Sequence, residues 1–253
     1  MPKTYTRPQT VPEALKLLAQ PHAFALGGGT YLNSPAAQAY ADEATLIDLQ
    51  ALGLNAISER GRTLEIGATA PLESLLQTPQ IPPALQETLR LQASLNLRNM
   101  ATAAGSLLSA DGRAPFAIAM LALDSRLTFA DESQCALGDV LPLPLPRLRG
   151  TLVTAVEIPL NVELAYQQVA RTPADLPIIA VAICRWQSGR TRVVLGGWSH
   201  TPALALDGPE PGGIEAAVRN VCESAGDDWA TAEYRSEVAI TLVQRCLATL
   251  PTP

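Results

Sequence analysis

A run of three consecutive glycines, at positions 27 to 29, follows a short apolar stretch at residues 24–26 and precedes Thr30. The apolar stretch predicts a strand that ends at the glycines. Because glycine has no Cβ atom, its backbone amides can approach an anion closely, and the Thr30 hydroxyl adds a donor. The run predicts a turn that could bind a pyrophosphate, and an ordinary tight turn is the alternative.

This turn matches neither of two common nucleotide-binding motifs. The GxGxxG motif requires a small residue at its last position and a helix whose N-terminus receives the phosphate. Here Thr30 and Tyr31 follow the third glycine, and no amphipathic helical pattern comes after them. The chain also lacks a GxxxxGK[ST] sequence, so we expect neither a Rossmann dinucleotide site nor P-loop hydrolysis.

A second segment of small residues, at positions 98–106, is predicted to be a loop. It ends in Thr102, Ala103, Ala104, Gly105 and Ser106. Ser109 and Asp111 follow within reach of the same bound group. Two loops of this kind could close on one diphosphate from both sides, and a packed Ala/Gly loop in the core is the alternative.

Apolar periodicity, proline and capping residues predict mixed helices and strands up to about residue 159. The expected strands are residues 4–6, 24–26, 44–49, 63–68, 126–129 and 152–159. The expected helices run from a cap at Thr10 to Pro21 and over residues 71–76, 82–94 and 114–123. The proline-rich residues 141–146 are predicted to be an extended connector, with a segment for a partner groove as the alternative.

A second region is expected from residue 160 onward. Residues 178–186 and 192–197 predict a hairpin closed at residues 188–190, and residues 214–224 and 234–250 predict helices. An antiparallel sheet with helices on one face would satisfy this pattern, so this region is expected to be an α+β layer. The predicted domains are therefore residues 1–159 and 160–253.

Charge and composition exclude several classes of function. The formal net charge of −6, without a basic stripe, argues against a nucleic-acid-binding protein. No stretch approaches the ~20 apolar residues that span a bilayer, and no secretory signal is present, so we expect a cytoplasmic protein. The four cysteines and two histidines are isolated in sequence, which predicts no metal site and no histidine-centred catalytic triad.

Both loops resemble motifs of one family, the flavoprotein subunits of molybdenum hydroxylases such as carbon monoxide dehydrogenase and xanthine dehydrogenase. Residues 26–32 are similar to its "AGGTDLL" loop, and residues 97–106 are similar to its "IRNxGTIGGN" segment. Residues 46–49, 66–69 and 151–159 resemble its "LIDL", "IGAxT" and "ELITxVxIP" strands. The resemblance runs in order along nearly the whole chain.

The resemblance implies an α+β fold: a PCMH-type FAD-binding domain of two α/β subdomains, followed by a small C-terminal α+β domain. FAD is the implied cofactor, with its pyrophosphate on the backbone of both loops and its isoalloxazine near Asp175 and Leu176. The implied cofactor-binding residues are Leu26, Gly27, Gly28, Gly29, Thr30, Tyr31, Leu32, Thr102, Ala103, Ala104, Gly105, Ser106, Ser109, Asp111 and Leu176. No side chain is expected to act as a catalytic acid or base.

Some positions depart from the family pattern. Ala104 stands where the family has glycine, and Ser106 where it has asparagine. Tyr31 stands where the family has an acidic or small polar residue, and Gln168 where it often has lysine. Pro115 replaces an aspartate that contacts the flavin's ribityl–ribose region, and Asp111 is the expected substitute. Of these exchanges, Pro115 and Ser106 favour an alternative, a structural subunit that has lost FAD.

The function implied by the resemblance is electron transfer within a complex. The expected partners are a molybdopterin-binding large subunit that oxidises the substrate and a small [2Fe–2S] subunit that supplies electrons. FAD would pass them to NAD⁺, oxygen or another acceptor. A third possibility is a stand-alone flavin oxidoreductase related to UDP-N-acetylenolpyruvoylglucosamine reductase.

Overall fold

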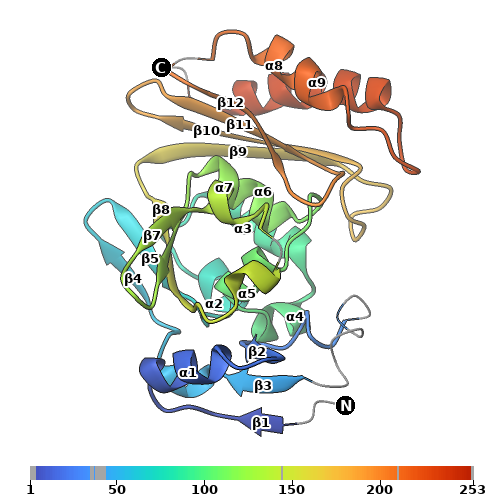
Figure 1. The fold of residues 1–253 in the computed structure, drawn as a ribbon. Coiled ribbons are helices and arrows are strands. Elements are labelled where there is room, and N and C mark those ends of the chain that lie inside the picture. The colour runs from blue at the N-terminus through green and yellow to red at the C-terminus, as the bar shows by residue number, and fades with distance from the viewer. Residues whose placement is uncertain (1–3, 35–36, 38–43, 144, 210, 252–253) are drawn as a thin grey trace. The chain divides into compact units, whose positions relative to one another are not determined.

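The structure is a computed structural model that describes residues 4–34, 37, 44–143, 145–209 and 211–251 (Figure 1). The chain divides into two compact units. Unit 1 comprises Met1–Thr78, Ala93–Ser109 and Arg126–Glu157, and unit 2 comprises Pro79–Gln92, Ala110–Ser125 and Ile158–Pro253. The domain boundary between residues 159 and 160 stays a prediction.

Unit 1 begins with a three-stranded parallel sheet in the order β1-β3-β2. Its elements are β1 (Thr4–Thr6), α1 (Val11–Leu18), β2 (Ala23–Leu26) and β3 (Thr45–Asp48). The predicted cap is confirmed, because the Thr10 side chain accepts a hydrogen bond from the Glu13 amide. Ala14 and Leu18 of α1 are buried in one cluster with Ala23 of β2 and Ile47 of β3, so α1 packs on the sheet that ends at the glycine turn.

Unit 1 also contains a five-stranded sheet in the order β4-β5-β8-β6-β7. Its strands are β4 (Ile57–Arg60), β5 (Thr63–Gly67), β6 (Arg126–Phe129), β7 (Gln134–Ala136) and β8 (Val153–Pro159). Its helices are α2 (Leu72–Leu76), α4 (Leu95–Met100), α5 (Ala103–Leu108) and α7 (Leu137–Val140), with 3-10 turns η2 (Gln50–Leu52) and η3 (Leu145–Leu148).

Two predictions for this unit are wrong. Residues 98–106 are not a loop, because α4 and α5 occupy them; alanine and leucine favour a helix once its first amides find acceptors. The amides of Ala103 and Ala104 donate to the carbonyls of Ala70 and Ala68, at 2.9 and 3.1 Å. The proline-rich connector is also not extended throughout, because η3 begins at Leu145; proline's fixed φ suits such turns as well.

Unit 2 is built on a four-stranded antiparallel sheet in the order β12-β11-β10-β9. Its elements are α3 (Pro83–Gln92), α6 (Pro115–Ala122), β9 (Val162–Val169), β10 (Ile179–Trp186), β11 (Thr191–Gly196), β12 (Ala203–Gly208), α8 (Ile214–Cys222) and α9 (Ala232–Thr249). The predicted hairpin and both C-terminal helices are confirmed. Strands β9 and β12 were not predicted.

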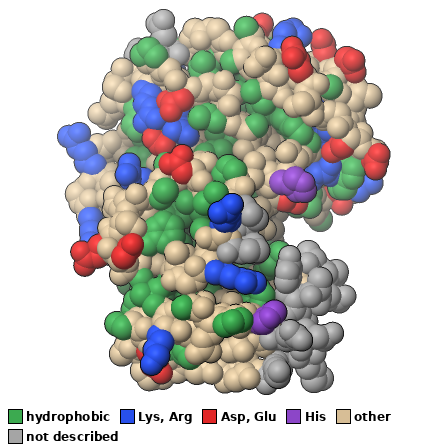
Figure 2. Space-filling model, in the orientation of Figure 1, with side chains coloured by type: hydrophobic (Ala, Val, Ile, Leu, Met, Phe, Trp, Pro, Cys, Tyr) green, Lys and Arg blue, Asp and Glu red, His purple; other side chains and the backbone are tan. Residues whose placement is uncertain are grey.

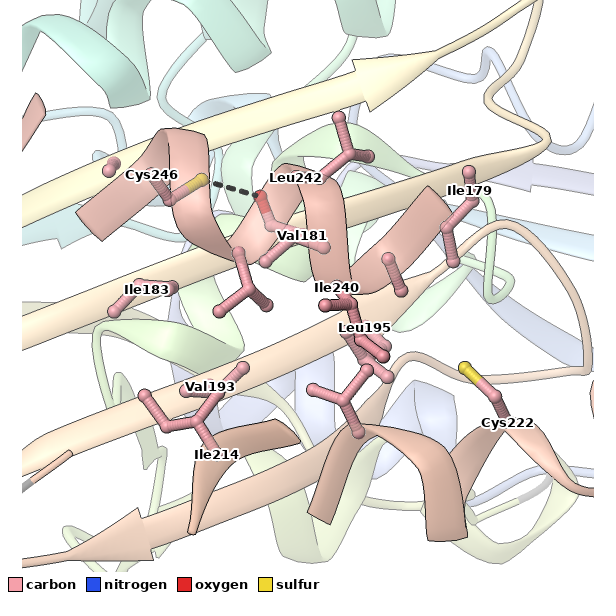
Figure 3. Close-up of a cluster of buried hydrophobic side chains, with 14 of the residues drawn as sticks. Ile179, Val181, Ile183, Val193, Leu195, Ile214, Cys222, Ile240, Leu242 and Cys246 are labelled. Carbon is pink, nitrogen blue, oxygen red and sulfur yellow. Dashed lines mark hydrogen bonds between the residues drawn. The ribbon is translucent and has the colours of Figure 1, made fainter. Parts of the chain in front are cut away.

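Both faces of this sheet are buried. Val181, Ile183 and Leu195 pack against α8 and α9, as Figure 3 shows. The neighbouring positions point the other way, and a Cβ atom at Gly196 would lie 2.3 Å from Cδ1 of Ile118 in α6. The antiparallel sheet is therefore as predicted, but the prediction of helices on one face only is wrong. Helix α6, from the middle of the sequence, contacts β10 and β11 on the face opposite α8 and α9.

The molecular surface carries mixed charge. Figure 2 shows acidic and basic side chains interspersed over the face that it draws. Within the described ranges, no helix is both long enough and apolar enough to cross a membrane.

Candidate functional site

The glycine turn lies directly against the start of α5. A Cβ atom at Gly28 would lie 1.5 Å from the carbonyl oxygen of Met100, which is closer than two atoms can approach. At Gly27 or Gly105, a Cβ atom would lie 2.7 Å from Oγ1 of Thr102. The two segments singled out in the sequence therefore meet, and glycine is required where their backbones touch.

The glycine turn leaves several of its backbone amides free. The amide and Nδ2 of Asn33 both donate to the carbonyl of Gly29, each at 3.0 Å, and Gly29 has a φ of +73°. Among the described residues, none accepts a hydrogen bond from the amides of Gly28, Gly29, Thr30 or Tyr31. Successive amides without protein acceptors are the arrangement that binds an anion.

The segment at α5 offers fewer amides than the sequence suggests. Ala103 and Ala104 donate to carbonyls of unit 1, and Ser106 donates to the carbonyl of Thr102 at 2.8 Å. The Ser109 hydroxyl donates to the carbonyl of Gly105 at 2.7 Å. The glycine turn therefore offers more amides without a described acceptor than the start of α5, against which it packs.

A cavity of about 220 Å³ opens beside the turn. The predicted residues that line it are Gly27, Gly28, Gly29, Thr30, Tyr31, Leu32, Thr102, Ala104, Gly105 and Ser109. Leu26, Ala103 and Ser106 belong to the same segments but do not line the cavity. Asp111 and Leu176 belong to unit 2, and their contact with the cofactor stays a prediction.

One wall of the cavity was missed in the sequence. Residues 148–153, between η3 and β8, line it together with Leu18, Ala23 and Leu49. This wall includes Arg149, the one lining residue among those described that carries a full charge. Residues 151–153 belong to the strand motif at 151–159, but that motif carries no signal of a binding site. Strand β8, which begins at Val153, lies beside β5 in the sheet.

Asp48, at the end of β3, stabilises the strand that supports the turn. It is buried and accepts hydrogen bonds from the Tyr5 hydroxyl, from Nε of Arg7 at 2.7 Å and from the Gln50 amide at 2.9 Å. Burial alone would raise the pKa of Asp48, but these hydrogen bonds lower it below its usual value. The adjacent Leu49 amide donates to the carbonyl of Leu26, where the glycine turn begins.

These residues fit a phosphorylated cofactor. Free amides and the Thr30 hydroxyl line a cavity whose other walls are mostly apolar, which suits a diphosphate joined to flat, apolar rings. The described part of the chain contains no group of His, Cys, Asp and Glu residues that could hold a metal ion. The fold and the cavity together suit the class of proteins that bind a nucleotide cofactor.

Comparison with known proteins gives the family. A family described as the FAD binding domain in molybdopterin dehydrogenase matches residues 1–161. The chain belongs to this family, as its sequence motifs predict. It is a FAD-binding medium subunit of the molybdenum hydroxylase type, a flavoprotein subunit of an oxidoreductase whose cofactor is FAD.

Several known proteins match this chain over most of their length. The glyceraldehyde dehydrogenase medium chain of Sulfolobus acidocaldarius is 23% identical over 220 residues, covering 81% of this chain and 78% of that one. A chain of CO dehydrogenase from Oligotropha carboxidovorans superposes with a TM-score of 0.82 at 24% identity, covering 97% of this chain and 96% of that one. A chain of quinoline 2-oxidoreductase from Pseudomonas putida 86 superposes with a TM-score of 0.77 at 22% identity, covering 97% of this chain and 95% of that one. These solved structures show the same α+β fold.

Proposed function

We propose that this chain transfers electrons through FAD within a complex, from a [2Fe–2S] small subunit to NAD⁺ or another acceptor. A molybdopterin-binding large subunit would oxidise the substrate. The observation that carries the proposal is the set of free amides from Gly28 to Tyr31 beside a cavity in a chain of this family. The names of the relatives, a dehydrogenase medium chain and CO dehydrogenase, support a multi-subunit oxidoreductase.

The residues of this chain have a binding task rather than a chemical one. Bound FAD would supply the exchange between one- and two-electron steps. The amides of Gly28–Tyr31 would hold the diphosphate, and the Thr30 hydroxyl would donate a further hydrogen bond. The apolar walls at Leu18, Leu49 and Leu152 would exclude water from the rest of the cofactor.

Co-purification of the complex tests this function. A tagged full-length chain should bring down a molybdopterin subunit and a [2Fe–2S] subunit, and the complex should contain bound flavin. Under anaerobic conditions, NADH added to the complex should bleach the flavin absorbance if NAD⁺ is the acceptor. A chain that purifies alone and turns over a substrate without partners would instead be a stand-alone flavin oxidoreductase.

The second candidate is a structural subunit without flavin, and Pro115 is the observation that favours it. This proline is buried at the first turn of α6, and it offers no side-chain acceptor where the family resemblance implies an aspartate. A complex that assembles with both partners but contains no flavin, even after incubation with FAD, would establish this second candidate.

A further inference from the structure

Arg149 stands on the wall of the cavity that faces FAD in the proposed function. It follows η3 and lines the same cavity as Gly27–Leu32. Its side chain is exposed, and no acidic side chain in the described residues pairs with it. Every other described charged residue lies away from this cavity, so Arg149 is its one cationic group.

A closed turn holds Arg149 in this place. The amide of Thr151 donates to the carbonyl of Leu148 at 3.2 Å, and the Thr151 hydroxyl donates to the same carbonyl at 2.7 Å. Gly150 has a φ of +73°, a left-handed conformation that glycine adopts without strain. The turn therefore fixes the backbone on both sides of Arg149 before any ligand binds.

The chemistry of the cavity calls for such a cation. A diphosphate carries full negative charge, whereas backbone amides offer only partial positive charge. A guanidinium can donate two parallel hydrogen bonds to phosphate oxygens and compensates their charge at any physiological pH.

We propose that Arg149 pairs with the diphosphate of FAD, opposite the free amides of the glycine turn. This inference rests on the proposed FAD site and adds to it a positioning residue outside both glycine-containing segments. Because Arg149 is exposed, its contribution should weaken as salt concentration rises.

The test compares two arginines of the same segment in the flavin-free full-length chain. Arg149→Gln and Arg149→Lys are titrated with FAD, with flavin fluorescence as the readout, at low and at high salt. Arg147→Gln is the matched control, because Arg147 is exposed, carries the same charge and does not line the cavity. Circular dichroism and the melting temperature confirm that each variant folds.

We expect Arg149→Gln to raise the Kd for FAD about tenfold at low salt, with a smaller effect at high salt. Arg149→Lys should recover only part of this loss, because lysine keeps the charge but cannot donate two parallel hydrogen bonds. Arg147→Gln should have the same Kd as the wild type. Equal FAD affinity of wild type and Arg149→Gln overturns the role of Arg149 alone. A wild-type chain that binds no FAD overturns the FAD site itself, and the two failures are therefore distinguishable.

Discussion

Gly28 decides how closely the turn and α5 can approach. Its Cα lies so near the Met100 carbonyl that even a methyl group has no room, and the obstacle is backbone that cannot rotate away. The three glycines therefore have different tasks: Gly28 permits a close contact, whereas Gly29 supplies a positive φ. Both features determine the backbone conformation in which the amides of the turn have no acceptor among the described residues.

The substitution Gly28→Ala should separate the turn from α5. We expect a loss of about 1–3 kcal/mol in the free energy of unfolding, measured by urea denaturation, and a large fall in FAD affinity. Gly226→Ala is the control, because a Cβ atom there would lie 3.7 Å from its nearest neighbour, the Ala232 amide nitrogen. A Gly28→Ala chain as stable as Gly226→Ala would contradict the close contact.

Arg235 in unit 2 is a buried cation that donates hydrogen bonds to Asp227 and to backbone carbonyls. It is fully buried, and its guanidinium donates to Oδ1 of Asp227 at 2.8 Å and to the Ile178 carbonyl at 2.8 Å. Burial alone would raise the pKa of Asp227, but hydrogen bonds from Arg235 and from the Trp229 and Ala230 amides lower it to about 2. The pair joins the start of α9 to the loop that precedes it.

This low pKa predicts a stability that depends on pH. A carboxylate with a depressed pKa stabilises the folded state above its unfolded pKa, and this stabilisation is lost as pH falls from about 4 through about 2. Asp227→Asn should therefore lower the unfolding free energy by about 2 kcal/mol at pH 7, and the difference should shrink on acidification. Urea denaturation at several pH values measures it; a difference independent of pH would contradict the ion pair.

Helices and strands whose signals lie within a few residues were predicted correctly from the sequence. The Thr10 cap, the hairpin at Gly189 and the long C-terminal helix α9 all carry their signals within a few residues. Prediction failed at α4 and α5, because the acceptors for the first amides of α5 are carbonyls of Ala68 and Ala70, far away in sequence. Tertiary hydrogen bonds therefore overrode a loop-like composition.

Helix α9 should contribute strongly to the stability of unit 2. Leu242 is buried in the cluster between α9 and the sheet (Figure 3). Arg245 on the same helix is exposed. We expect Leu242→Ala to lower the unfolding free energy by about 2–5 kcal/mol, and Arg245→Ala to change it by less than about 0.5 kcal/mol. Equal effects of the two substitutions on urea denaturation would show that this face of α9 is not packed.

For the molecule as a whole, the sequence predicted the family and the α+β fold, and the binding role of the glycine turn stays a prediction. The sequence did not predict that residues 148–153 form a wall of the cavity, because the strand motif at 151–159 carries no signal of a binding site. It also could not show that amides of α5 are already bonded within the protein. Both gaps concern contacts between segments that are distant in sequence.

In the proposed site, main-chain amides of the glycine turn hold the diphosphate of FAD. A crystal structure of the full-length chain with FAD tests it most directly. We predict diphosphate oxygens within about 3.2 Å of amide nitrogens between Gly28 and Tyr31. A flavin bound elsewhere, with those amides turned away from any phosphate, would contradict the claim.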